Sequence, residues 1–194
     1  MSLRPAPSPV LHARTLTALF ALSTLAVACS KKGGEASDVA GAAGAAARVA
    51  SESASKGTIH LEVTGGPNAG SYDADMSDGG CSYGLAGPTA WGNQYSIDTD
   101  DATKFSSLQL VVPDTKSAAG GTTAFQITAQ FGPLFSGGKS YSVNSRPDAP
   151  KKSGSGTVTV EDHGSTGRVT FDAKTDDNVE LKGTIDCTSV MRNG

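Results

Sequence analysis

Two groups of closely spaced aspartates carry the residue type that binds hard cations. They are Asp73, Asp75 and Asp78 in the first group and Asp98, Asp100 and Asp101 in the second. Calcium takes about six to eight oxygen ligands, so such groups are candidate calcium ligands, although neither has the spacing of an EF-hand loop. Aspartates also favour turns, where their side chains bond nearby backbone N–H groups. Solvated turns are the preferred interpretation, and no cofactor is expected.

Known catalytic motifs are absent from the sequence. Of the three histidines, His60 alternates with apolar residues and His163 lies in the turn sequence Glu161-Asp-His163-Gly-Ser. We find no His-Glu-x-x-His motif, no Gly-x-Ser-x-Gly elbow and no phosphate-binding loop. Two carboxylates can hydrolyse a glycosidic bond, but the 16 acids of residues 57–194 make a nominal pair uninformative. We assign no catalytic residue and predict that the protein is not an enzyme.

The only tryptophan begins the segment Trp91-Gly-Asn-Gln-Tyr95. On a β-strand, Trp91, Asn93 and Tyr95 would share one face, where two rings and an amide could stack on a sugar and bond its hydroxyl groups. These three residues are therefore candidate ligand-binding residues. The preferred interpretation places the same face in the core, because Ile97 has the same parity.

From Gly57 onward, apolar and polar residues alternate in short runs, which is the period of a half-buried β-strand. The runs are 59–63, 72–76, 91–97, 108–112, 125–131, 157–161, 169–173 and 179–187. Residues 132–155 are predicted to hold one short strand within a long loop. Turn sequences such as Gly65-Gly-Pro-Asn68 separate the runs. The pattern predicts an all-β domain over residues 57–194, an antiparallel sandwich or a closed barrel of about 8–9 strands.

This predicted domain is acidic. Residues 57–194 contain 10 Lys and Arg against 16 Asp and Glu, a net charge of −6, whereas the whole chain has a net charge of −3. Such a domain lacks the basic surface that binds phosphate backbones. We therefore exclude nucleic acid as a partner.

The N-terminal segment has the pattern of an export signal. Arg4 and Arg14 precede an uncharged apolar run, Leu16–Ala28, of 13 residues. A spanning helix needs about 20 residues, so this run has the length of a signal-peptide core instead. It ends in Leu25-Ala-Val-Ala-Cys29, which resembles the lipobox of bacterial lipoproteins. The family usually has Leu or another aliphatic residue where this sequence has Ala26.

The lipobox resemblance implies a signal peptide over residues 1–28, cleaved before Cys29, and acyl chains such as palmitate on that cysteine. Residues 29–56, rich in Ala, Gly and Ser, would form a disordered tether with a reach of about 25–30 Å. Ser30 resembles the residue of lipoproteins that are passed to the outer membrane. The expected location is the outer membrane or cell surface, anchored by lipid. The alternative is an ordinary secretory signal that leaves Cys29 as a free thiol.

Cys81 and Cys187 are the remaining cysteines once Cys29 is lipidated. An even pair in an exported protein predicts a disulfide, because oxidation persists in such compartments. A redox pair would normally show Cys-x-x-Cys spacing, which is absent. Two buried free thiols are the alternative.

The sequence has a lipobox cysteine, a tether and an early cysteine, and it closes with Gly156-Thr-Val-Thr-Val160 and Gly183-Thr-Ile-Asp-Cys187. This layout is similar to that of the mycobacterial lipoprotein-antigen family. This resemblance implies a surface lipoprotein with a small β-sandwich and supplies no catalytic residues. The sequence thus predicts a lipid-anchored, disulfide-linked β domain that binds an unassigned protein or glycan. A glycan- or calcium-binding module of the envelope is the first alternative, and a small envelope hydrolase is the second.

Overall fold

The computed structural model describes residues 56–193. The predicted signal peptide, Cys29 and the tether up to residue 55 lie outside the described residues. Within residues 56–193, no helix is long and apolar enough to span a membrane.

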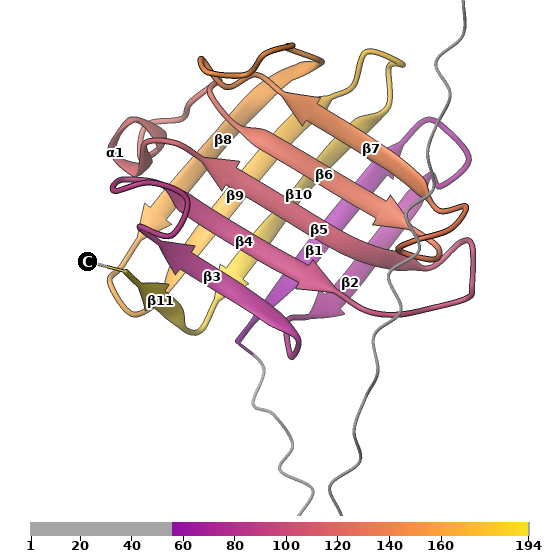
Figure 1. The fold of residues 1–194 in the computed structure, drawn as a ribbon, viewed down its shortest axis with the longest axis horizontal. Helices are drawn as coiled ribbons and strands as arrows, with labels where there is room; N and C mark the ends of the chain where they lie inside the picture. Colours follow the sequence, from indigo (N-terminus) through magenta and orange to yellow (C-terminus); the bar gives the residue numbers. More distant parts are fainter. Residues whose placement is uncertain (1–55, 194) are drawn as a thin grey trace, which may run out of the picture. The chain divides into compact units, whose positions relative to one another are not determined.

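Two β-sheets pack face to face, so the predicted sandwich is confirmed in preference to a closed barrel (Figure 1). The five-stranded sheet has the order β2 (Gly70–Asp75), β1 (Gly57–Thr64), β10 (Glu180–Cys187), β9 (Gly167–Lys174) and β8 (Ser155–Asp162). The six-stranded sheet has the order β11 (Val190–Arg192), β3 (Gly79–Tyr83), β4 (Trp91–Ser96), β5 (Phe105–Val112), β6 (Gln126–Phe131) and β7 (Lys139–Asn144). The strands of one sheet cross over those of the other (Figure 1). The single helical turn α1 (Thr115–Ala118) is capped by Asp114.

Strands β3 and β11 are not among the predicted runs. β3 contains Gly79, Gly80 and Ser82 and so lacks alternating large apolar residues. β11 has only three residues, and it pairs in parallel with β3, with Val190 beside Cys81. Parallel pairing of two distant segments leaves no local signal in the sequence. The short strand predicted within 132–155 is confirmed as β7.

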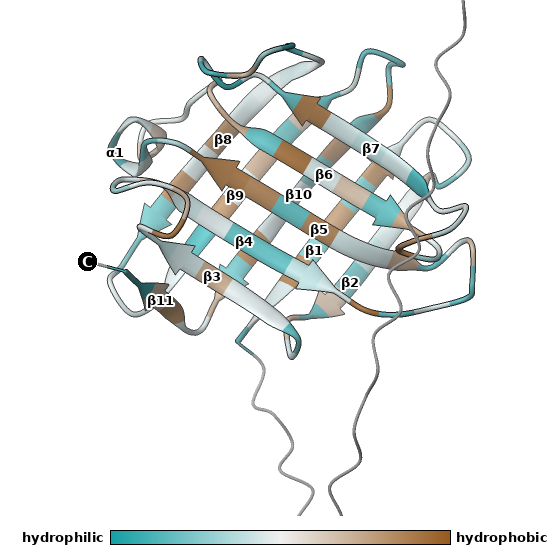
Figure 2. Ribbon diagram, viewed as in Figure 1, coloured by the Kyte–Doolittle hydropathy of each residue, from teal (hydrophilic) through white to brown (hydrophobic). Residues whose placement is uncertain are grey.

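The core lies between the sheets and contains the inward residues of the predicted runs. Along β9, buried and exposed residues alternate without interruption, and Figure 2 shows the matching bands of apolar and polar residues along the strands. Aromatic rings fill one end of the core: Phe105, Phe131 and Tyr72 pack with centroid separations of 4.8–6.1 Å. Removal of this apolar surface from water is the main force that holds the sheets together.

The disulfide occupies another part of the core, and a glycine beside it makes room for Trp91. Cys81 and Cys187 are bonded with their Cα atoms 6.1 Å apart, as predicted. Cys187 lies between Gly57 of β1 and Gly167 of β9. A Cβ atom at Gly167 would lie 2.5 Å from the ring of Trp91. The missing side chain therefore leaves the space that the indole from the opposite sheet fills.

Candidate functional site

The predicted aromatic platform is wrong as a surface site, because its residues face the core. Trp91, Asn93 and Tyr95 are exposed by 0%, 5% and 5%. They lie on the inner side of β4, as the preferred interpretation held. A sugar has no access to these rings in this arrangement.

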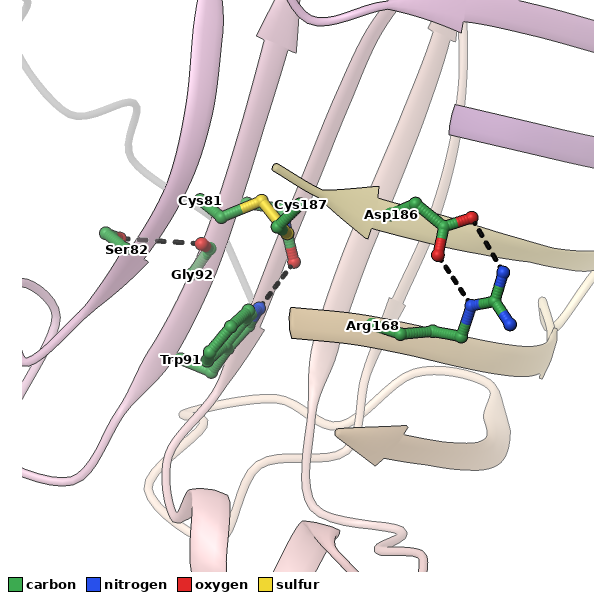
Figure 3. Close-up of a disulfide and its surroundings, with 8 residues drawn as sticks. Cys81, Ser82, Trp91, Gly92, Arg168, Asp186 and Cys187 are labelled. Atoms are coloured by element: carbon green, nitrogen blue, oxygen red, sulfur yellow. Dashed lines mark hydrogen bonds and ion pairs between the residues drawn. A yellow bond between two sulfur atoms is a disulfide. The ribbon is translucent and has the colours of Figure 1, made fainter. Parts of the chain in front are cut away.

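Trp91 instead lies beside the disulfide (Figure 3), and Asn93 contacts both of its sulfur atoms. The indole N–H of Trp91 donates to Oδ1 of Asn93 at 2.9 Å. The amide nitrogen of Asn93 lies 2.9 Å from Sγ of Cys81 and 3.4 Å from Sγ of Cys187. The buried amide thus has a partner on both of its ends, as buried polar groups require.

The candidate calcium ligands do not assemble into a site. Within residues 56–193, no three His, Cys, Asp or Glu side chains gather closely enough to hold a metal. Asp73 accepts a hydrogen bond from His60. Asp101 accepts from the backbone N–H and the hydroxyl of Thr103 at 2.9 and 2.8 Å, which lowers its pKa. Asp101 thus has the turn geometry of the preferred interpretation, whereas Asp73 lies within β2 and contacts the neighbouring strand β1.

The side chains of the turn at Glu161–His163 contact one another and the C-terminal strand. Nε2 of His163 lies 3.8 Å from Glu161, while Asp162 forms an ion pair with Arg192 of β11. The pair ties the β8–β9 turn to the C-terminal strand.

His60 has carboxylates beside both ring nitrogens on the outer face of the five-stranded sheet. Nδ1 lies 2.8 Å from Asp73 and Nε2 lies 3.7 Å from Glu62. The hydrogen bond with Asp73 is the largest cause of a raised His60 pKa, because it favours the charged imidazolium.

We predict that His60 titrates above its ordinary pKa of 6.5 and that Asp73→Asn returns the midpoint towards that value. Since folding raises this pKa, the stabilisation is complete below the unfolded-state pKa of about 6.5 and is lost as the pH rises through the folded-state pKa. NMR titration of the imidazole protons measures both midpoints. A wild-type midpoint at or below 6.5 would contradict the prediction.

The outer face of the five-stranded sheet is highly charged. Arg168 of β9 forms a bidentate pair with Asp186 of β10 at 2.6 and 3.0 Å (Figure 3). Lys182 lies 3.5 Å from Asp172 and 3.4 Å from Glu180. Each Lys and Arg of this face is therefore paired with an acid, and the acids outnumber them.

The outer face of the six-stranded sheet, here called the neutral face, has no charged residue at its outward strand positions. Strand pairing places there Gly80, Ser82, Gly92, Gln94, Ser96, Ser107, Gln109, Val111, Gln126, Thr128, Gln130, Ser140, Ser142, Asn144 and Met191. One sheet of this acidic domain therefore presents only amides, hydroxyls, glycines and two apolar side chains.

A groove with a volume of about 780 Å³ is hollowed into the neutral face over β11, β3, β4 and β5. Gln94 and Gln109 lie opposite each other on β4 and β5 and line it. Leu85 and Met191, also in its lining, are exposed by 65% and 67%. Lys56 and Asp78 add one charge of each sign from outside the strands. The volume falls within the range of small-molecule sites, about 300–1,000 Å³.

The sequence pattern predicted strand β4, but the candidate ligand-binding residues that it indicated lie on the inner side of this strand. The groove residues are the intervening ones, Gly92, Gln94 and Ser96. A detectable signal was the lack of charged residues in the segments 79–97 and 105–112, in a domain with 26 charged residues.

The fold and the groove together define a disulfide-linked β-sandwich with one charged and one neutral outer face. Comparisons with protein-family models, with curated proteins and with solved structures found no match.

Proposed function

We propose that this protein is an exported lipoprotein that displays its β-sandwich on a tether and binds a partner, without catalysis, through the groove of the neutral face. The sequence supports the anchor through its apolar signal run and the lipobox-like segment ending at Cys29. The observation that carries the binding role is the groove itself, which combines two exposed amides with two exposed apolar side chains.

The distribution of exposed apolar side chains supports the groove as the binding surface. Three large apolar side chains are exposed among the described residues: Leu85, Met191 and Phe135. Two of these three line the groove. Apolar side chains grouped at a concave surface are typical of interaction sites.

The composition of the groove favours binding over hydrolysis. Asp78 is the single acid in its lining, and no histidine lines it. Glycoside hydrolysis needs two carboxyl groups on either side of the bond. The groove does not supply that pair.

The anchor is tested by the intact mass of the protein extracted from membranes, before and after reduction and alkylation. We expect a chain that starts at Cys29 and is heavier by its acyl chains, with two thiols that react only after reduction. Cys29→Ser is the control and is expected to leave the membrane fraction, because stable anchoring requires the lipid. An unlipidated wild-type chain with a free Cys29 thiol would refute the display role.

A further inference from the structure

We infer that the partner is an uncharged glycan, held in the groove by the amides of Gln94 and Gln109 and covered by Leu85 and Met191. This inference rests on the proposed function and adds the ligand class to it. The proposed site lies on the outer side of β4, whereas the candidate aromatic platform of Trp91, Asn93 and Tyr95 lies on its buried inner side.

The charge distribution of the neutral face disfavours anionic ligands. No outward strand position of the neutral face carries a formal charge, whereas the other sheet displays matched ion pairs on the same protein. A nucleic acid, a sulfated glycan or an acidic peptide would require cations that the groove does not concentrate. A neutral ligand supplies no counter-charge. If it covered a charged side chain of the protein, that charge would lose its water without gaining a partner, which costs free energy. An uncharged floor is therefore complementary to an uncharged ligand.

The two glutamines offer the hydrogen-bonding groups that sugar hydroxyls need. A glutamine amide has one accepting oxygen and two N–H donors, while a hydroxyl group both donates and accepts. Gln94 and Gln109 are directly paired across β4 and β5, so their Cβ atoms lie about 4.5–5.5 Å apart. Adjacent amides at this spacing can bond neighbouring hydroxyl groups of one sugar chain.

Both amides are available for a ligand. Among the described residues, neither Gln94 nor Gln109 makes a side-chain hydrogen bond. Gln130 differs, because its Nε2 atom donates to the carbonyls of Pro133 and Leu134 at 3.0 and 3.1 Å. Asn93 also differs, because it is committed to Trp91 and the disulfide.

The floor and walls of the groove suit a sugar ring. Gly80 and Gly92 carry no side chain beside Gln94, and this gives the groove its depth. Leu85 and Met191 present apolar surface, which can cover the C–H groups of a sugar, and methionine adapts well to irregular shapes. The row of polar residues continues from Gln109 to Thr128 and Ser142. The groove itself lies over the four strands β11, β3, β4 and β5, which at their usual spacing span about 14 Å, and this length accommodates an oligosaccharide rather than one sugar.

The test is binding of the mature, full-length lipoprotein in detergent to neutral glucan, mannan and galactan oligosaccharides and to their carboxylated and sulfated counterparts. We expect binding to at least one neutral series and none to its charged counterpart. The double variant Gln94→Ala/Gln109→Ala should raise Kd about 10- to 100-fold, since each lost hydrogen bond weakens binding by about 3- to 10-fold.

Thr170→Ala/Thr184→Ala is the matched control, because it removes two outward polar groups from the other sheet and should leave Kd unchanged. Circular dichroism and the thermal midpoint show that each variant is folded. Binding that is unaffected by the glutamine substitutions would overturn the assigned site. Binding only to charged glycans, only to a protein, or only to a second copy in light scattering would overturn the ligand class while leaving the groove and the proposed function intact. Loss of the lipid anchor in the mass measurement would instead refute the proposed function.

Discussion

Replacing Cys81 and Cys187 together with alanine is expected to lower the free energy of unfolding by about 4–5 kcal/mol. The bond joins residues separated by 106 positions, so it closes a long loop in the unfolded chain and restricts that state strongly. Domains are stable by about 5–15 kcal/mol in total. Losing the bond should therefore remove a large part of the stability.

The position of the disulfide adds to this effect. Cys81 lies in β3 of the six-stranded sheet and Cys187 ends β10 of the five-stranded sheet, so the bond links the two layers directly. Its sulfur atoms also contact the amide nitrogen of Asn93. Without them, a buried donor loses its partners and the indole network beside it is weakened.

Guanidinium unfolding of the full chain, followed by circular dichroism, measures the change. Reduced wild-type protein is the first control and should resemble the alanine variant. Cys81→Ser/Cys187→Ser is the second and should be less stable still, because it buries hydroxyl groups. Equal unfolding midpoints for oxidised and reduced wild type would show that the bond does not stabilise the domain.

The strands could be predicted because alternation records which residues face the core. Ile59, Leu61 and Val63 of β1 are buried as their parity indicates. The pairing of Cys81 with Cys187 could also be predicted, since these are the two cysteines of residues 57–194 and they allow one bond. β11 could not, because its parallel partner β3 lies more than 100 residues away and its three residues carry no period.

The groove was harder to predict, because it depends on residues that lack side chains and on strands brought together by folding. Alternation separates Trp91 and Asn93 from Gly92 and Gln94 and indicates that the first pair faces inward, but it does not show which strands bring their outward residues together. The aspartates illustrate the same limit: their spacing suggests a common ligand, but Asp73 contacts His60 and Asp101 contacts Thr103. Aspartates that are close in the sequence therefore do not gather around one point in the fold.

Under the proposed function, binding and stability depend on different parts of the same sandwich. The five-stranded sheet pairs Arg168 with Asp186 and Lys182 with Asp172. On the six-stranded sheet, the side chains of Gln94 and Gln109 make no hydrogen bond within the described residues. Because the core network lies between the sheets, substitutions on the neutral face should alter binding without unfolding the domain, and core substitutions should do the reverse.

Trp91→Ala is expected to destabilise the domain by about 3–5 kcal/mol. The side chain is fully buried, and its removal leaves a cavity beside the disulfide and removes the donor to Oδ1 of Asn93. Trp91→Phe separates the two causes. It retains much of the ring volume but loses the N–H group, so we expect a cost of about 1–3 kcal/mol. Chemical unfolding followed by far-UV circular dichroism measures both variants.

Gly167 provides the strongest test of this packing. In the wild type, Gly167→Ala should be destabilising by about 1–3 kcal/mol, because its Cβ would lie 2.5 Å from the indole ring. In the Trp91→Ala background the ring is gone, so the same substitution should cost less. A backbone contact remains, since the new Cβ would also lie 2.9 Å from the carbonyl oxygen of Glu161. The two substitutions should therefore couple by about 0.5–3 kcal/mol in a double-mutant cycle. Strict additivity would mean that the indole does not occupy the space above Gly167.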